Sequence, residues 1–175
     1  MKGSTAARPE NSPNEWVEEV DLAGNVLRMV TRREMREGRL RHRAVFVAVV
    51  SADGDVLVHQ RAATKDVWPS WWDVAVGGVV SPGESYEAAA VRELAEEVGV
   101  EAVSIEPLGT GAYEDGDVSL VAACFVCRTD GPFTFADGEV TTAHWVSPAE
   151  LLIWLGSRPF LPDSVALVLP RLGLE

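Results

Sequence analysis

The segment from Gly77 to Val100 constrains the fold of this 175-residue chain more than any other. An apolar strand is expected at Val74–Val76, and it runs into a glycine pair. A loop through Gly83 follows, and a helix is expected to begin near Ser85, a residue type that caps helix N-termini well. The order of strand, glycine-rich loop and helix is typical of sites that handle phosphate groups.

This predicted helix carries three glutamates one turn apart. At about 100° per residue, Glu93, Glu96 and Glu97 share one face. A second, apolar face is expected from Val91, Leu94, Ala95 and Val98. Like charges at this spacing cost about 0.2–0.5 kcal/mol per pair, so a bound cation such as Mg²⁺ or Mn²⁺ is one interpretation. The alternative is three solvated glutamates, with Arg92 paired to Glu96.

The glycines of the preceding loop favour the metal-binding interpretation. Gly77 and Gly78 allow the backbone to come close to a ligand or a metal ion. Gly83 permits a tight return of the chain into the helix. Loop and helix together therefore predict a binding site rather than an ordinary surface helix.

The segment resembles the signature motif of the Nudix hydrolases, with the family's spacing unbroken. The matching positions are Gly78, Glu84, Arg92, Glu93, Leu94, Glu96, Glu97, Gly99 and Val100. A match of this length is far more specific than a lone glycine motif. The wider resemblance extends from about Glu15 to Leu155.

The resemblance implies a fold and a reaction. The fold is of the α/β class, a Nudix-type α/β/α sandwich with a mixed β-sheet, here with an added N-terminal hairpin. The reaction is hydrolysis of a diphosphate linkage in a nucleoside diphosphate derivative or related phosphorylated small molecule. Water attacks phosphorus, while Mg²⁺ or Mn²⁺ neutralises the developing charge.

The resemblance also implies roles for individual residues. Glu93 and Glu97 correspond to the main metal ligands, and the Gly77 carbonyl to an additional metal contact. Glu96 corresponds to a further ligand or to the base that activates water. The remaining motif positions, Arg92 and Glu84, correspond to residues that orient the acids and brace the loop.

Residues outside the motif are further candidates. The general base can lie there, and the possible acids are Glu114, Asp115, Asp117 and Glu139. The alternative, favoured for any one of them, is an ordinary loop acid. Arg61 and Lys65 are candidates for binding substrate phosphates, although a surface or ion-pair role is the alternative. Glu139 is a further candidate for binding the substrate.

Upstream segments 42–44 and 60–73 resemble the Nudix branch that includes isopentenyl diphosphate isomerase. The isomerase has a catalytic cysteine and a metal-binding histidine where this chain has Gly77 and Val79. It also has two glutamates near Val118–Leu120, where this chain is apolar. A hydrolase of this isomerase-like subgroup is therefore favoured, and isomerase activity is one alternative. His42 matches an isomerase metal ligand or is a structural histidine.

A non-catalytic nucleotide-binding module is the third functional alternative. The intact set of glutamates argues against it, because a domain without catalysis has no need to retain acids that repel one another. The three tryptophans Trp68, Trp71 and Trp72 could stack on a substrate ring. Core packing is the alternative for Trp68 and Trp72, whereas Trp71 stays open.

The rest of the chain predicts one domain. Residues 1–13 are expected to be a disordered tail, and residues 14–175 a single domain that includes an N-terminal hairpin extension at 14–43. A buried hairpin is expected from 44–50 and 56–60. Further strands are expected at 103–110, 118–128 and 142–146, and helices at 148–155 and 163–169.

Charge and composition exclude several classes. A net charge of −12 argues against general nucleic-acid binding. Six arginines crowd one stretch and are interpreted as a phosphate patch, a solvated face or an intersubunit contact: Arg32, Arg33, Arg36, Arg39, Arg41 and Arg43. The last alternative makes a homodimer one possible assembly. Cys124 and Cys127 should face opposite sides of a strand and so form no redox pair. Without a long apolar run or a signal peptide, a cytoplasmic location without membrane contact is expected.

Overall fold

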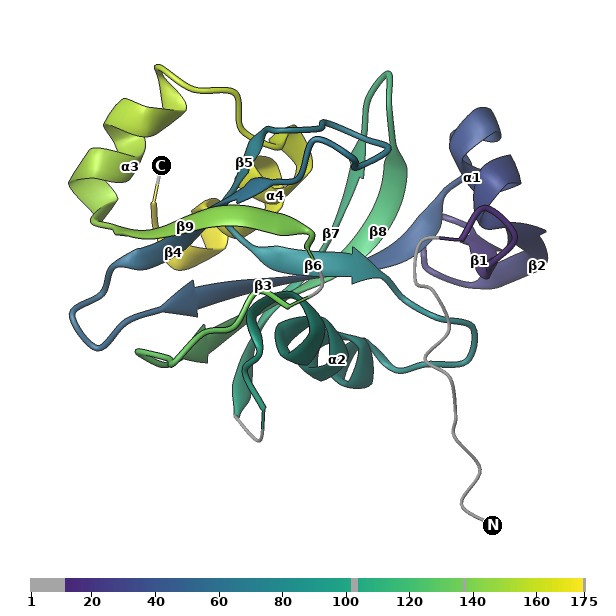
Figure 1. The fold of residues 1–175 in the computed structure, drawn as a ribbon. Coiled ribbons are helices and arrows are strands. Elements are labelled where there is room, and N and C mark those ends of the chain that lie inside the picture. The colour runs from purple at the N-terminus through teal and green to yellow at the C-terminus, as the bar shows by residue number, and fades with distance from the viewer. Residues whose placement is uncertain (1–11, 102–103, 137, 175) are drawn as a thin grey trace, which may run out of the picture.

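The computed structural model describes residues 12–101, 104–136 and 138–174, and a mixed β-sheet forms its centre (Figure 1). The strands are β1 (Trp16–Val20), β2 (Val26–Thr31), β3 (His42–Val50), β4 (Val56–Arg61), β5 (Trp72–Asp73), β6 (Val76–Val79), β7 (Ile105–Glu114), β8 (Ser119–Arg128) and β9 (Val140–Val146). The helices are α1 (Arg32–Gly38), α2 (Tyr86–Val98), α3 (Pro148–Leu155) and α4 (Pro162–Val168), followed by the 3₁₀ turn η1 (Pro170–Leu172). None of the helices in these ranges is long and apolar enough to cross a membrane.

Strand β3 organises the sheet. It runs parallel to β8 along its whole length and antiparallel to β6 from Ala44 to Val47. Strands β3 and β4 pair only at Val50 and Val56, next to the turn that joins them. The predicted hairpin of 44–50 and 56–60 is therefore wrong beyond its turn. A strand has two edges, and those of β3 are occupied by β6 and β8, so β4 diverges to pair with β5 and β9.

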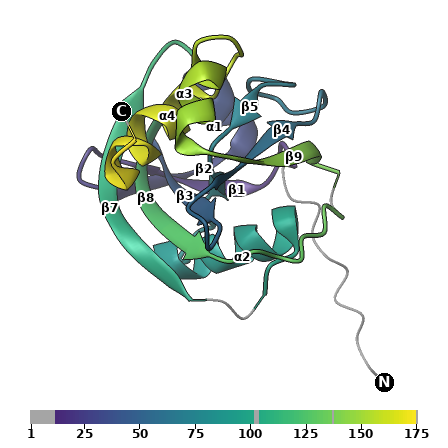
Figure 2. The same ribbon diagram turned by 90° about the vertical axis from the view of Figure 1, so that its left-hand side faces the viewer.

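The two faces of β3 belong to different cores. Phe46 and Ala48 pack in one cluster, whereas Val45 and Val47 pack in another, as the two-residue period of a strand requires. Helices α3 and α4 cover the first face and α2 covers the second (Figure 2). The predicted α/β/α sandwich with a mixed sheet is confirmed.

The two cysteines follow the same alternation on β8. Cys124 lies in the cluster beneath α3 and α4, and Cys127 lies in the cluster beneath α2. Both thiols are free and buried. The expectation that they face opposite sides of a strand is confirmed.

The N-terminal hairpin is also confirmed. Strands β1 and β2 pair antiparallel, and β1 joins the sheet beside His42 of β3. Helix α1 begins with a capping box in which Thr31 and Glu34 satisfy each other's backbone N–H groups. Residues 1–11 of the predicted tail lie outside the described residues. At the end of that tail, the Pro13 carbonyl accepts a hydrogen bond from the Arg33 N–H.

Helix α2 and the strand before it differ from the prediction in two ways. The glycine pair lies inside β6, where Gly77 and Gly78 pair with β3, instead of in a loop after a strand at 74–76. Val91 is exposed, because the buried stripe of α2 runs through Ala90, Leu94 and Val98. Glu93 and Glu97 also lie on this inward side, so acidic and apolar faces are not separate.

The other elements match closely. Helix α3 has the predicted bounds, and α4 begins one residue earlier, at Pro162. Strand β7 continues to Glu114, four residues beyond the predicted end. Its predicted first residue, Val103, lies outside the described residues.

Asp163 in the first turn of α4 makes stability depend on pH. Burial, and secondarily the nearby charge of Asp73, raises its pKa from 3.8 to about 7. Between these values the folded state binds more protons than the unfolded state, so this group lowers the free energy of unfolding as pH rises.

We expect Asp163→Asn to remove this component. Relative to the native chain, the variant should gain stability between pH 5 and pH 8, on the order of a few kcal/mol because one pKa unit is about 1.4 kcal/mol. Urea unfolding of both proteins at the two pH values measures the difference. An equal effect of the substitution at both would contradict it.

Candidate active site

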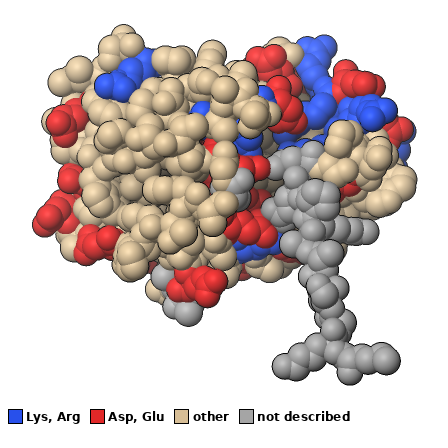
Figure 3. All heavy atoms as spheres, viewed as in Figure 1, with Lys and Arg blue, Asp and Glu red and all other residues tan. Residues whose placement is uncertain are grey.

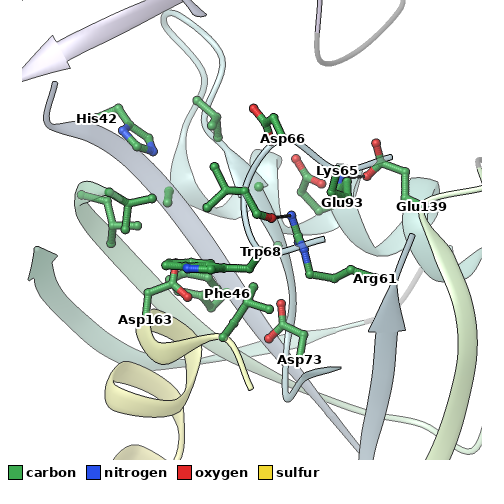
Figure 4. Close-up of a pocket in the computed structure, with 18 of the residues that line it drawn as sticks. His42, Phe46, Arg61, Lys65, Asp66, Trp68, Asp73, Glu93, Glu139 and Asp163 are labelled. Carbon is green, nitrogen blue, oxygen red and sulfur yellow. Dashed lines mark hydrogen bonds and ion pairs between the residues drawn. The ribbon is translucent and has the colours of Figure 1, made fainter. Parts of the chain in front are cut away.

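A cavity of about 100 Å³ lies where α1, the segment 61–68, β3 and α2 meet (Figure 4). We call it the pocket. Its acidic lining residues include Asp73, Glu93, Glu97 and Glu139, and its basic ones Arg32, Arg36, Arg61, Lys65 and Arg92. Its apolar wall includes Phe46, Trp68, Val118, Leu120 and Leu161. Opposite charges thus share one small cavity with an apolar wall.

Two of the three helix glutamates enter the pocket. Glu93 and Glu97 are 7% and 4% exposed and line it, whereas the Glu96 side chain is 37% exposed and is not among the lining residues. Burial, and next the charge of Glu93, raises the pKa of Glu97 well above its usual value. Two neighbouring buried carboxylates are costly unless protons or cations compensate them.

Arg92 connects the motif acids. Its guanidinium donates to both Glu84 carboxylate oxygens at 3.0 Å, to Glu93 at 2.8 Å and to Glu96 at 3.1 Å. These hydrogen bonds and charges raise its pKa despite the desolvation that opposes them. Glu84 also accepts from the Ser81 N–H, so the loop before α2 is held to the helix.

The glycine pair is required by close packing. A Cβ atom on Gly78 would lie 2.2 Å from Glu93 Oε1, and one on Gly77 would lie 2.1 Å from the Val45 carbonyl oxygen. Any larger residue would displace the carboxylate or the strand. The glycines therefore allow β6 to lie directly between β3 and the acids of α2.

The donor atoms fit a hard divalent cation in part. Glu93 and Glu97 supply buried carboxylate oxygens, and Gly77 lines the same pocket. Within residues 12–101, 104–136 and 138–174, no group of three His, Cys, Asp or Glu side chains converges into a complete metal site. Water and substrate oxygens would complete the shell, as is common for Mg²⁺.

The predicted substrate-binding residues lie together. Arg61, Lys65 and Glu139 all line the pocket, and Lys65 forms an ion pair with Glu139 (Figure 4). Arg61 donates to the Val67 carbonyl oxygen at 3.3 Å.

The other acids considered as bases lie elsewhere. Glu114 accepts from Arg41 and Ser119, and Asp115 accepts from Tyr113 and the backbone of its own turn. Asp117 accepts from the Trp68 indole at 3.2 Å. None of the three acids is among the described residues that line the pocket.

His42 and Trp68 line the pocket, whereas Trp72 lies in the core. His42 is buried, its Nδ1 lies 3.1 Å from the Leu40 carbonyl oxygen, and burial lowers its pKa to about 4. Trp72 is buried against Trp154, with ring centroids 5.2 Å apart, which confirms core packing. Trp68 is half-buried, packs against the core and also lines the pocket.

Some acidic lining residues were not singled out from the sequence, namely Asp66, Asp73 and Asp163, and Arg32 and Arg36 were named only as members of the arginine run. The arginine run divides in the structure: Arg32 and Arg36 line the pocket, Arg43 pairs with Glu18, and Arg33 is exposed. The spacing of Arg32 and Arg36, one helical turn apart, was the available signal.

Comparison with known proteins agrees with this geometry. A family model described as the NUDIX domain matches residues 40–164. An uncharacterized Nudix hydrolase of Yersinia pestis is 37% identical over 151 residues, which cover 86% of this chain and 82% of that protein. The uncharacterized Nudix hydrolase YfcD of Escherichia coli K12 is 36% identical, with 86% and 83% covered.

Solved structures show the same fold. The crystal structure of DR0079 from Deinococcus radiodurans superposes with a TM-score of 0.75 at 27% identity, covering 88% of this chain and 97% of that one. The NUDIX domain of NrtR from Shewanella oneidensis, solved as a complex with ADP ribose, gives 0.60 at 22% identity, with 79% and 95% covered. With its motif intact and its sequence matched over most of its length, this chain belongs to the Nudix hydrolase family.

Proposed function

We propose that this protein is a metal-dependent hydrolase that cleaves a diphosphate linkage in a nucleoside diphosphate derivative or a related small molecule. The observation that carries the proposal is the buried, mutually repelling pair Glu93 and Glu97 in a pocket that also contains Arg61 and Lys65. Carboxylates for a metal beside cations for phosphate suit phosphoryl chemistry.

Bound Mg²⁺ or Mn²⁺ would lower the pKa of a water molecule and offset charge on phosphoryl oxygens. Glu93 and Glu97 would hold it, with the Gly77 carbonyl as a further contact. Arg92 and Glu84 would keep Glu93 oriented through their hydrogen bonds.

The general base is assigned on position. Glu139 lines the same pocket as Glu97 and would act as the base once its carboxylate is released from Lys65, with which it forms an ion pair. Glu96, the base or ligand expected from the family, would first have to turn from Arg92 toward the pocket. Arg61 and Lys65 would bind the substrate's phosphates.

Isomerase activity has less support. The sequence has two cysteines, and both lie on β8 in the cores, outside the pocket lining. The isomerase-like subgroup, a homodimer and a cytoplasmic location stay predictions. We also infer that 14–175 works as one unit, because the hairpin extension joins the sheet at His42.

We expect Glu97→Gln to lower the metal-dependent turnover number at least about a hundredfold, since metal catalysis supplies several kcal/mol. Glu87→Gln is the matched control, because Glu87 lies exposed on the same helix. Phosphate release with Mg²⁺ or Mn²⁺, across nucleoside diphosphates, dinucleotides, nucleotide sugars and isopentenyl diphosphate, measures it.

Two outcomes would contradict the proposal. Full activity of Glu97→Gln would exclude its role as a metal ligand. An inactive native chain that binds one of these compounds tightly would instead indicate a binding module.

Gly78→Ala should also abolish most activity, because its Cβ would occupy the space of the Glu93 carboxylate. Gly116→Ala is the control, since a Cβ there meets nothing within 4 Å. Turnover and thermal unfolding are measured for both variants. If Gly78→Ala kept native activity, the close packing of β6 against Glu93 would not matter for catalysis.

A further inference from the structure

The N-terminal extension contributes cations to the pocket. Arg32 and Arg36 are four residues apart on α1, so they share one helix face, and both line the pocket. Arg33, between them, is exposed. All three precede residue 40, where the match to the NUDIX family model begins. Basic side chains also gather in the region of α1 in the space-filling view (Figure 3).

Three guanidinium groups meet at this end of the pocket. Arg36 is largely buried, which lowers its pKa, and the charges of Arg32 and Arg61 lower it further while Asp66 opposes them. Arg32 Nη1 lies 3.4 Å from Glu15, and Arg36 Nε lies 3.0 Å from Asp66. The charge of Arg61 acts on a third lining carboxylate, Asp163, and partly offsets the rise in its pKa.

Some of these guanidinium donors are unused. The Nε atoms of Arg32 and Arg61 are buried and find no hydrogen-bond partner in the part of the chain that the structure describes. Buried N–H groups normally have partners, and a guanidinium presents its donors in a planar fork that suits phosphate oxygens. A cavity of about 100 Å³ has room for such an anion.

We propose that Arg32, Arg36 and Arg61 form a second phosphoryl-binding subsite, distinct from the Glu93 and Glu97 pair. The inference rests on the proposed function and deepens it: the substrate carries a terminal phosphoryl group that the arginines hold while another phosphorus is attacked. Substrates without that second anionic group should be poor ones.

The test is calorimetric titration of inorganic pyrophosphate into the full chain in EDTA, so that no metal contributes. Arg32→Gln and Arg36→Gln should each raise Kd roughly tenfold or more, because each removes charge-assisted hydrogen bonds. The matched control Arg33→Gln, on the same helix, should change Kd by less than about twofold, as expected for an exposed charge.

A further variant that keeps every arginine tests the subsite without relying on a loss of binding, which misfolding could also cause. Asp66→Asn removes the carboxylate that competes for Arg36 and should tighten pyrophosphate binding. Circular dichroism and thermal unfolding verify that each variant is folded.

The subsite is overturned if pyrophosphate does not bind the metal-free native chain, if Arg33→Gln weakens binding as much as Arg32→Gln, or if Asp66→Asn leaves Kd unchanged. These outcomes leave the hydrolase proposal untouched. Conversely, suppose that the native chain shows no metal-dependent hydrolysis while the arginine variants weaken pyrophosphate binding as expected. That result would contradict the hydrolase proposal and leave the anion-binding site standing.

Discussion

Glu93 and Glu97 point inward from a helix that packs on the sheet, where apolar residues would ordinarily stabilise the fold. The energetic cost of two neighbouring buried carboxylates explains much of the surrounding structure. Gly78 leaves space for the Glu93 carboxylate, and Arg92 hydrogen-bonds to it at 2.8 Å. For Glu97, burial and the charge of Glu93 raise the pKa, and the charge of Lys65 opposes them.

The same helix still anchors the fold. Leu94 and Val98 are fully buried beside the acids and pack against β3 and β8. Strand β4 leaves β3 beyond Val56, and the segment 61–68 at its end lines the same pocket as the acids of α2. A metal bound by the acids would therefore stabilise the folded state as well as serve catalysis.

Local signals made much of this predictable. Caps, glycines and period-two strands placed most elements, and the motif pointed to Glu93 and Glu97. Strand pairing could not be predicted as well, because the sequence of β3 does not reveal that β6 and β8 occupy its edges. The sequence also predicted separate acidic and apolar faces on α2. In the structure Glu93 and Glu97 share the inward side with the apolar residues, and Val91 is exposed.

The arginine end of the pocket could not be predicted from the sequence, because it depends on how α1 packs in the tertiary structure. Arg32 and Arg36 belong to a short polar helix, and their spacing predicts that they share one face, but the local sequence does not show which face meets the pocket. Only the packing of the hairpin beside His42 brings them toward Arg61. Sequence far from a motif can thus decide which substrate the motif serves.

The central claim is that Glu93 and Glu97 bind a divalent cation. Its most direct test is titration of Mn²⁺ into the metal-free protein, with free Mn²⁺ followed by electron paramagnetic resonance. The account predicts Mn²⁺ binding by the native chain that weakens at least about tenfold in Glu93→Gln and in Glu97→Gln, since each loses one charged oxygen ligand, and that is unchanged in Glu87→Gln. Equal Mn²⁺ affinity in all four proteins would contradict it.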